Sequence, residues 1–222
     1  LFTMARQTAI SINTIPIGPL GIIGMPGCEE LTDKIDQYLV KWRKTQAIEH
    51  AESIAFFGYQ RDSYKIDITI PRFGSGEGKG VINESVRGYD IYIVCDVFNY
   101  SCTYNMYGKE VCMSPDDHFA DLKRVISALC SKPKRVSVIM PMLYEGRQHK
   151  RSSRESLDCA MALKELVHLG VENIITFDAH DQRVQNAIPD KSFENVMPTY
   201  QMIKALVNNV DDLKVDKDHL MV

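Results

Sequence analysis

The feature that most constrains the fold is an alternation of short apolar runs with longer segments of helical period. The runs, which are nearly continuous in apolar residues, are Leu20–Met25, Asp90–Val97, Val136–Met140 and Asn173–Phe177. Such runs are typical of strands that are covered on both faces. Apolar residues spaced three and four apart predict helices at Glu29–Lys44, Ser114–Cys130, Glu155–Leu169 and Pro198–Asn209. This alternation predicts an α/β fold with a mostly parallel sheet flanked by helices.

The pattern also predicts details of individual elements. The segment Ile66–Ile70 alternates apolar and polar residues, as in a half-buried strand. We expect the first helix to bury one face, made of Leu31, Ile35, Tyr38, Leu39 and Trp42. Ligands of parallel sheets collect beyond the carboxyl ends of the strands, so the polar segments that follow residues 70, 140 and 177 are candidate binding segments.

Composition excludes several classes of protein. Of the 222 residues, 45% are hydrophobic and 25% are charged, which is usual for soluble globular proteins. The formal net charge of −3 argues against general nucleic-acid binding, and no apolar run approaches the length of a membrane span. The first residues lack the pattern of a signal peptide. We therefore expect a cytoplasmic protein with no nucleic-acid or membrane partner.

None of the six cysteines forms a CxxC pair, so the sequence gives no support for a zinc-ribbon or thioredoxin function. Cys95 lies in an apolar run, and Cys130 and Cys159 lie in helical patterns. These three are expected to be buried free thiols in a reducing compartment.

The first candidate segment is rich in glycine and runs from Phe73 to Gly80. It is not a Walker phosphate loop, because Phe73 stands where the first glycine should be and Gly80 where Ser or Thr should bind magnesium. The glycines also miss the GxGxxG spacing. The alternative is the tip of a hairpin, since glycine suits tight turns.

The second candidate segment, Tyr144–Glu155, carries four firm positive charges within eight residues, at Arg147, Lys150, Arg151 and Arg154. Arginine pairs well with phosphate oxygens, so a phosphate-rich ligand would suit this position after a buried strand. The alternative is a solvated loop leading to a helix cap, with Ser152 and Glu155 at capping-box spacing.

The third candidate segment, Phe177–Gln182, places Asp178, His180 and Asp181 directly after a strand. It could hold a metal or a nucleotide. Alternatively, one aspartate caps the next turn and His180 is a surface residue. Magnesium prefers oxygen ligands, so a histidine by itself would suit a softer metal.

These segments, in this order, resemble ribose-phosphate pyrophosphokinases (phosphoribosyl pyrophosphate synthetases). The family's Phe-x-Asp-Gly-Glu motif is similar to Phe73–Glu77, and its Ser-Val-Arg-Gly stretch to Ser85–Gly88. The family's Tyr-Ala-Arg-Gln-Asp loop is similar to Tyr144–His149, and its Phe-Asp-Leu-His motif to Phe177–His180. The resemblance covers roughly residues 20–222.

The resemblance implies a phosphoribosyltransferase-like fold and transfer of the diphosphoryl group of ATP to the 1-hydroxyl of ribose 5-phosphate. The products are phosphoribosyl pyrophosphate and AMP, and Mg²⁺ is required. By the same resemblance, Phe73 stacks near the adenine, and Ser75, Gly76 and Glu77 contact the base. Arg147 and Gln148 hold the nucleotide and its phosphates, and His180 helps to bind the metal–ATP complex. A homo-oligomer that holds ATP between subunits is also implied.

The chain departs from the family pattern at two motif positions, where Ser75 and His149 replace aspartates. The segment Tyr100–Met113 is longer than is usual in the family. The expected organisation is an extension at 1–18, an ATP-binding domain at 19–217, and the start of a C-terminal domain at 218–222, where His219–Val222 begins a strand. The catalytic residues are expected in that C-terminal part, so the 222 residues alone should bind ATP weakly and form no product.

Two alternatives to a synthetase are considered. A non-catalytic regulatory paralogue is suggested by Ser75 and His149. A phosphoribosyltransferase is disfavoured, because its strand ending in two carboxylates followed by a Thr/Gly loop is not found.

Overall fold

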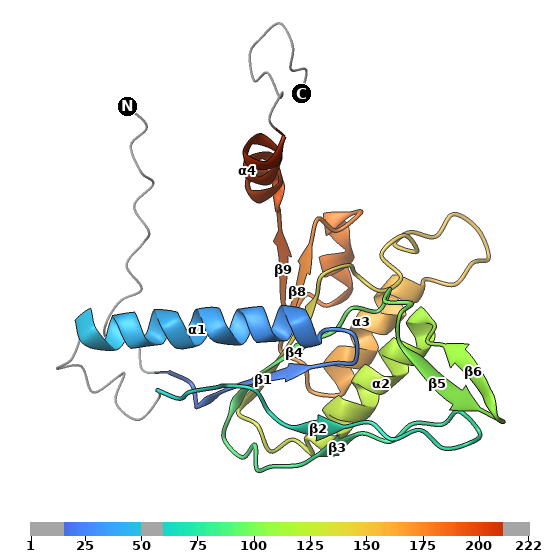
Figure 1. Cartoon of the computed structure of the whole chain (residues 1–222). Helices are drawn as coiled ribbons and strands as arrows, with labels where there is room; N and C mark the ends of the chain where they lie inside the picture. Colours follow the sequence, from blue (N-terminus) through green and yellow to red (C-terminus); the bar gives the residue numbers. More distant parts are fainter. Residues whose placement is uncertain (1–15, 50–59, 211–222) are drawn as a thin grey trace, which may run out of the picture.

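A computed structural model describes residues 16–49 and 60–210 of the chain. Its centre is a five-stranded sheet in the order β1-β4-β7-β8-β9 (Figure 1). The bounds are Leu20–Gly24 for β1, Asp90–Val94 for β4, Arg135–Met140 for β7, Asn173–Phe177 for β8 and Ser192–Val196 for β9. All four pairings are parallel, which confirms the predicted sheet.

Helices cover both faces of this sheet. α1 (Glu29–Glu49) covers one face, and α2 (Pro115–Ala128) and α3 (Asp158–His168) cover the other. α4 (Thr199–Asn209) has no buried residue and extends away from the sheet beyond β9 (Figure 1), and a 3₁₀ helix, η2, spans Gln182–Ala187. The side chains of Ile22 and Val94 pack beneath α1, whereas their neighbours Ile23 and Ile93 belong to the larger core with α2 and α3. This alternation follows from the two-residue period of a strand.

Two short hairpins lie outside the main sheet. In the first, β2 (Ile68–Thr69) pairs antiparallel with β3 (Val81–Ile82). In the second, β5 (Thr103–Met106) pairs antiparallel with β6 (Lys109–Cys112). Figure 1 shows that the β5–β6 hairpin and the loop between β2 and β3 both extend beyond α2, on the same side of the molecule.

The buried face of α1 differs from the expected one. Leu31, Tyr38 and Trp42 are exposed, and Tyr38 retains 67% of its accessible surface. The buried residues on this helix include Asp36, whose carboxylate accepts a hydrogen bond of 2.7 Å from the backbone N–H of Tyr64. A polar residue faces inward because the neighbouring extended backbone supplies a donor that the carboxylate satisfies.

Two further expectations are wrong. α3 begins at Asp158 instead of Glu155: Ser152 does donate to Glu155 at 3.3 Å, but both are exposed and precede the first buried residue of the helix, Cys159. Cys130 is exposed, because α2 ends at Ala128 and Cys130 turns away with a φ of 51°. Cys95 and Cys159 are buried as expected.

Neither described stretch of the chain contains a helix with the length and apolar content needed to cross a bilayer. The strand expected at His219–Val222, and most of the extension expected at residues 1–18, lie outside the described residues.

Candidate functional site

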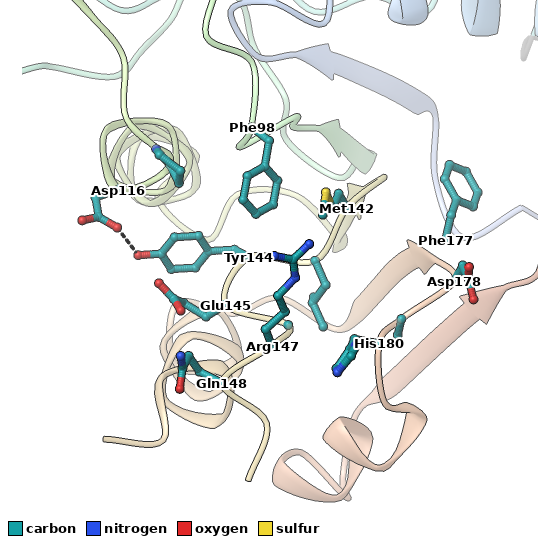
Figure 2. A pocket seen from close by; sticks show the side chains of 14 residues that line it. Phe98, Asp116, Met142, Tyr144, Glu145, Arg147, Gln148, Phe177, Asp178 and His180 are labelled. Carbon is teal, nitrogen blue, oxygen red and sulfur yellow. Dashed lines mark hydrogen bonds between the residues drawn. The ribbon is translucent and has the colours of Figure 1, made fainter. Parts of the chain in front are cut away.

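A cavity of about 850 Å³ lies at the carboxyl edge of the main sheet (Figure 2). Its walls come from the loop after β7, the loop after β8, the first turn of α2 and Phe98. Two of the three segments singled out from the sequence, those that begin at Tyr144 and Phe177, therefore meet at one site. This is the place that a parallel sheet predicts, because the carboxyl ends of its strands share one edge.

One wall of the cavity is held by Tyr144. Its hydroxyl donates to Asp116 Oδ1 at 2.5 Å, and its ring stacks on Phe119 with the ring centroids 4.3 Å apart. Burial, together with the carboxylate of Asp116, raises the pKa of Tyr144. The loop after β7 is thereby tied to the start of α2, and the hydroxyl stays protonated at neutral pH.

The same wall is acidic. Burial, with the charges of Asp158 and Asp116, raises the pKa of Glu145. Glu145 has a φ of 56° and Asp178, across the cavity, has a φ of 46°. Positive φ values are uncommon outside glycine, and such backbone conformations gather at functional sites. Both of these residues line the cavity.

The other side of the cavity is basic. Figure 2 shows Arg147, from the loop after β7, beside His180, from the loop after β8. The described part of the chain gives the Arg147 guanidinium no carboxylate partner. Gln148 also lines the cavity, and its backbone N–H closes a turn on the Glu145 carbonyl at 2.8 Å. An unpaired guanidinium in a cavity favours an anionic ligand.

His149 links the two loops behind the cavity. Its Nε2 lies 3.4 Å from Asp181 Oδ2, and its ring meets the edge of the His180 ring with the centroids 5.1 Å apart. Its Nδ1 is buried and has no hydrogen-bond partner within the described structure. The hydrogen bonds from Arg183 hold the pKa of Asp181 well below its usual range, so this carboxylate is charged at neutral pH.

The loop Phe73–Glu77 lies elsewhere. None of its five residues lines the cavity, and it forms the tip of the β2–β3 hairpin. The tip is closed by backbone hydrogen bonds from Phe73 to Glu77 and from Gly76 to Phe73. The hairpin expectation for this segment is thus confirmed. Ser75 Oγ donates to Glu77 Oε2 at 2.8 Å, and Phe73 is 54% exposed.

The predicted site residues therefore form two groups. Arg147, Gln148 and His180 come together in the cavity, whereas Phe73, Ser75, Gly76 and Glu77 do not join them within one chain. The physical reason is that β2 pairs with β3 in a separate small sheet. The segment after residue 70 does not follow a strand of the main sheet and so does not reach its carboxyl edge.

Sequence reasoning missed several residues of the cavity wall, notably Phe98, Asp116 and Met142. Asp116 was detectable: it follows a helix cap, and helices in a parallel sheet begin at the same edge where the strands end. Phe98 and Met142 carry no local signal, since a single apolar residue in a loop is common.

The residues present do not form a complete metal site. Among the described residues, no three His, Cys, Asp or Glu side chains converge on a point that could hold a metal ion. Magnesium usually keeps several waters and binds through one or two protein groups plus substrate phosphates. The described residues would therefore hold Mg²⁺ only together with ligands from a bound phosphate group.

Comparison with known proteins gives consistent matches. The family model of the N-terminal domain of ribose phosphate pyrophosphokinase matches residues 20–170. The ribose-phosphate pyrophosphokinase of Vibrio cholerae is 25% identical over 150 residues, which cover 66% of this chain and 43% of that protein. Ribose-phosphate pyrophosphokinase 1 of Schizosaccharomyces pombe is 29% identical over 148 residues, which cover 66% of this chain and 32% of the relative.

A solved structure, that of phosphoribosylpyrophosphate synthetase from Mycobacterium smegmatis, is similar in fold, with a TM-score of 0.62 at 18% sequence identity. The likeness covers 86% of this chain and 52% of that one. It confirms the phosphoribosyltransferase-like fold. The chain spans about half or less of the length of the proteins it matches.

Proposed function

Since the chain belongs to the ribose-phosphate pyrophosphokinase family, we propose that it supplies the ATP-binding domain of a ribose-phosphate diphosphokinase. In this reaction O1 of ribose 5-phosphate attacks the β-phosphorus of ATP, and the bond from that phosphorus to the α-phosphate oxygen breaks. The products are phosphoribosyl pyrophosphate and AMP. The observation that carries the proposal is the cavity at the sheet edge, where Arg147 lies beside His180 and has no carboxylate partner among the residues that the structure describes.

The cavity suits a triphosphate. Arg147 would pair with phosphate oxygens, and Gln148 would add hydrogen bonds to the nucleotide. His180 would contact the Mg²⁺–ATP complex, whose metal neutralises charge on the phosphates. Tyr144, protonated and bonded to Asp116, holds the loop that carries Arg147 in place. Positioning and neutralisation of charge are the main requirements of phosphoryl transfer.

The base would be bound by a second copy of the chain. Phe73 is exposed and lies outside the cavity of its own chain, so it is free to stack on an adenine held by a neighbour. Ser75, Gly76 and Glu77 would then contact the edge of the base. We infer a homo-oligomer with ATP between protomers, a cytoplasmic location, and a nucleotide-binding domain at residues 19–217. The residues that act on ribose 5-phosphate would come from a C-terminal domain.

Binding of ATP and of inorganic tripolyphosphate to the 222-residue chain, measured by calorimetry with Mg²⁺, tests this function. Arg147→Ala should weaken both ligands about 10- to 100-fold, because a hydrogen-bonded charge pair is lost. Arg151→Ala is the matched control: it removes an exposed charge of the same loop that does not line the cavity, and should change affinity little. Equal losses of affinity in the two variants would show that the ligands are attracted by net charge alone, and would contradict a specific binding site at Arg147. The chain alone should release no AMP in the presence of ribose 5-phosphate.

The second candidate function is that of a non-catalytic regulatory subunit. Two observations favour it: the Glu77 carboxylate accepts from Ser75 of its own loop, and His149 occupies the place of an aspartate beside His180. A regulatory subunit would bind to a catalytic relative and change its rate. Addition of this chain to an active synthetase would then alter turnover, whereas an unchanged rate at saturating concentration would favour the first function.

A further inference from the structure

The β5–β6 hairpin has no role in the function proposed so far. It lies in the segment Tyr100–Met113, and the residues of its two strands are exposed or half-buried, with none in the main core. It extends instead toward the loop between β2 and β3 (Figure 1). We call residues 73–77, at the tip of that loop, the Phe73 loop.

The tip of the hairpin is bonded directly to the Phe73 loop. The backbone N–H of Tyr107 donates to the carbonyl of Gly74 at 2.8 Å. A Cβ atom on Gly76 would lie 2.9 Å from Met106 Sδ and 3.4 Å from the Tyr104 ring. The two hairpin side chains therefore pack against the backbone of Gly76, and a side chain at Gly76 would force the flexible Met106 side chain to move. The φ of 91° at Gly76 is a second reason for glycine at this position.

Arg72, which precedes the Phe73 loop, contacts both the β5–β6 hairpin and α2. Its guanidinium lies over the Tyr104 ring, 4.5 Å from the centroid, and donates to the carbonyl of Gly76 at 2.9 Å. It also donates to Asp121 Oδ2 at 2.6 Å, and this α2 carboxylate is almost fully buried. The guanidinium thus connects the hairpin, the Phe73 loop and α2. The ring attracts the cation, and partial shielding from water strengthens this attraction, so Tyr104 helps to hold the guanidinium in place.

The turn between β5 and β6 has an unusual backbone conformation. Tyr107 and Gly108 have φ values of 50° and 77°, as in a two-residue turn in which both central residues are left-handed. Asn or Gly is usual at the first position, and a bulky residue there is strained. The Tyr107 N–H that bonds Gly74 belongs to this residue, so the contact with the Phe73 loop helps to hold the strained turn.

We propose that the β5–β6 hairpin is a positioning element for nucleotide binding, and that Tyr104 is its positioning residue. Tyr104 holds Arg72 and the backbone of Gly76, and thereby keeps the Phe73 loop in the form that presents Phe73 to the base. This inference rests on the proposed function, since it assumes that Phe73 contacts the adenine.

The test compares Tyr104→Leu, which removes the ring beneath Arg72, with Tyr104→Phe, which keeps it. Calorimetry with Mg²⁺ measures affinity for ATP and for inorganic tripolyphosphate, which lacks the base. Tyr104→Leu should weaken ATP about tenfold and leave tripolyphosphate unchanged, whereas Tyr104→Phe should bind ATP as the unmodified chain does. Phe73→Ala should reproduce the Leu variant. Tyr38→Leu, the same change at an exposed position of α1, is the matched control.

Amide hydrogen exchange tests the contact between the hairpin and the Phe73 loop without any nucleotide. Exchange at Tyr107 and Gly76 should accelerate in Tyr104→Leu and return to normal in Tyr104→Phe, while amides of β4 and β7 stay protected. Unchanged exchange overturns the inference whatever the chain binds. Equal loss of ATP and tripolyphosphate in Tyr104→Leu also overturns it. If the unmodified chain binds ATP no more tightly than tripolyphosphate, the proposed role of Phe73 fails, and a positioning role toward the base fails with it.

Discussion

At the scale of single residues, Asp121 is a buried carboxylate whose charge balances two guanidinium groups. It is buried on α2 and accepts from Arg72 and Arg124, both at 2.6 Å. Asp121→Asn would leave two guanidinium groups facing a neutral amide. Because removal of one partner leaves buried charge uncompensated, the free energy of unfolding should fall by about 2–4 kcal/mol. Urea denaturation at pH 7 measures the loss.

The matched control is Asp33→Asn, which breaks an ion pair with Lys65 at 2.6 Å in which both side chains are half exposed. Water screens such a pair, so its loss should cost less than about 1 kcal/mol. Similar losses in the two variants would contradict the view that the Asp121 cluster is structural.

Single residues also show what sequence patterns can and cannot predict. Cys95 and Cys159 lie inside periodic segments and are buried, but Cys130 lies two residues beyond the end of its helix and is exposed. Asp36 is polar and yet faces inward, because the N–H of Tyr64, which is distant in sequence, satisfies it. Periodicity describes a residue's own element. It does not describe what another segment brings to that element.

At the scale of elements, the start of α2 shows how local chemistry fixes a boundary. Ser114 Oγ accepts from the backbone N–H of Asp117 at 3.1 Å, and Asp117 Oδ2 accepts from the backbone N–H of Ser114 at 2.9 Å. The sequence predicts a helix that begins at Ser114, and in the structure Ser114 caps a helix that begins at Pro115. We expect Ser114→Ala to cost about 1 kcal/mol in the free energy of unfolding at pH 7.

The same substitution should change the response to acid. Burial alone would raise the pKa of Asp117, but hydrogen bonds from Ser114 and the charge of Arg72 outweigh it and leave that pKa lowered. A lowered pKa in the folded state adds stability above the ordinary pKa of aspartate, and this stability is lost as pH falls through the folded value. The difference between the original chain and Ser114→Ala should therefore shrink from pH 7 to pH 3. Ser127→Ala, on the exposed side of the same helix, should show no such trend.

Elements differ in how far the sequence defines them. The first four strands of the main sheet along the chain were predicted, because a short and nearly continuous apolar run between turn residues indicates a strand that is covered on both faces. β9 and the β5–β6 hairpin were not predicted: β9 alternates exposed and half-buried residues at the sheet edge, and the hairpin is mostly exposed. Their pairing depends on partners rather than on apolar content, so local patterns give little sign of them.

At the scale of the whole molecule, the sequence predicted the parallel sheet and the place of the cavity, but not that the motif residues divide into two groups. Motif order is linear, whereas the topology places β2 and β3 outside the main sheet. The Arg147 loop and the His180 loop follow adjacent strands and meet, and the Phe73 loop does not. Under the function proposed above, one chain would hold two parts of a site, and a second copy would complete it.

A mixing experiment tests this arrangement. Phe73→Ala removes the ring proposed to stack on the base, and Arg147→Ala removes the group proposed to bind the phosphates, so each variant alone should bind a fluorescent ATP analogue poorly. If each site takes its Phe73 loop and its cavity from different chains, random association of the two variants restores about a quarter of the sites. A mixture of Phe73→Ala with the double variant contains no chain with an intact loop and should restore none. Because the two substitutions lie on different chains of each restored site, recovery cannot come from either variant alone. Failure to recover, with both variants folded and associated, would place base and phosphate binding within one chain and contradict a shared site.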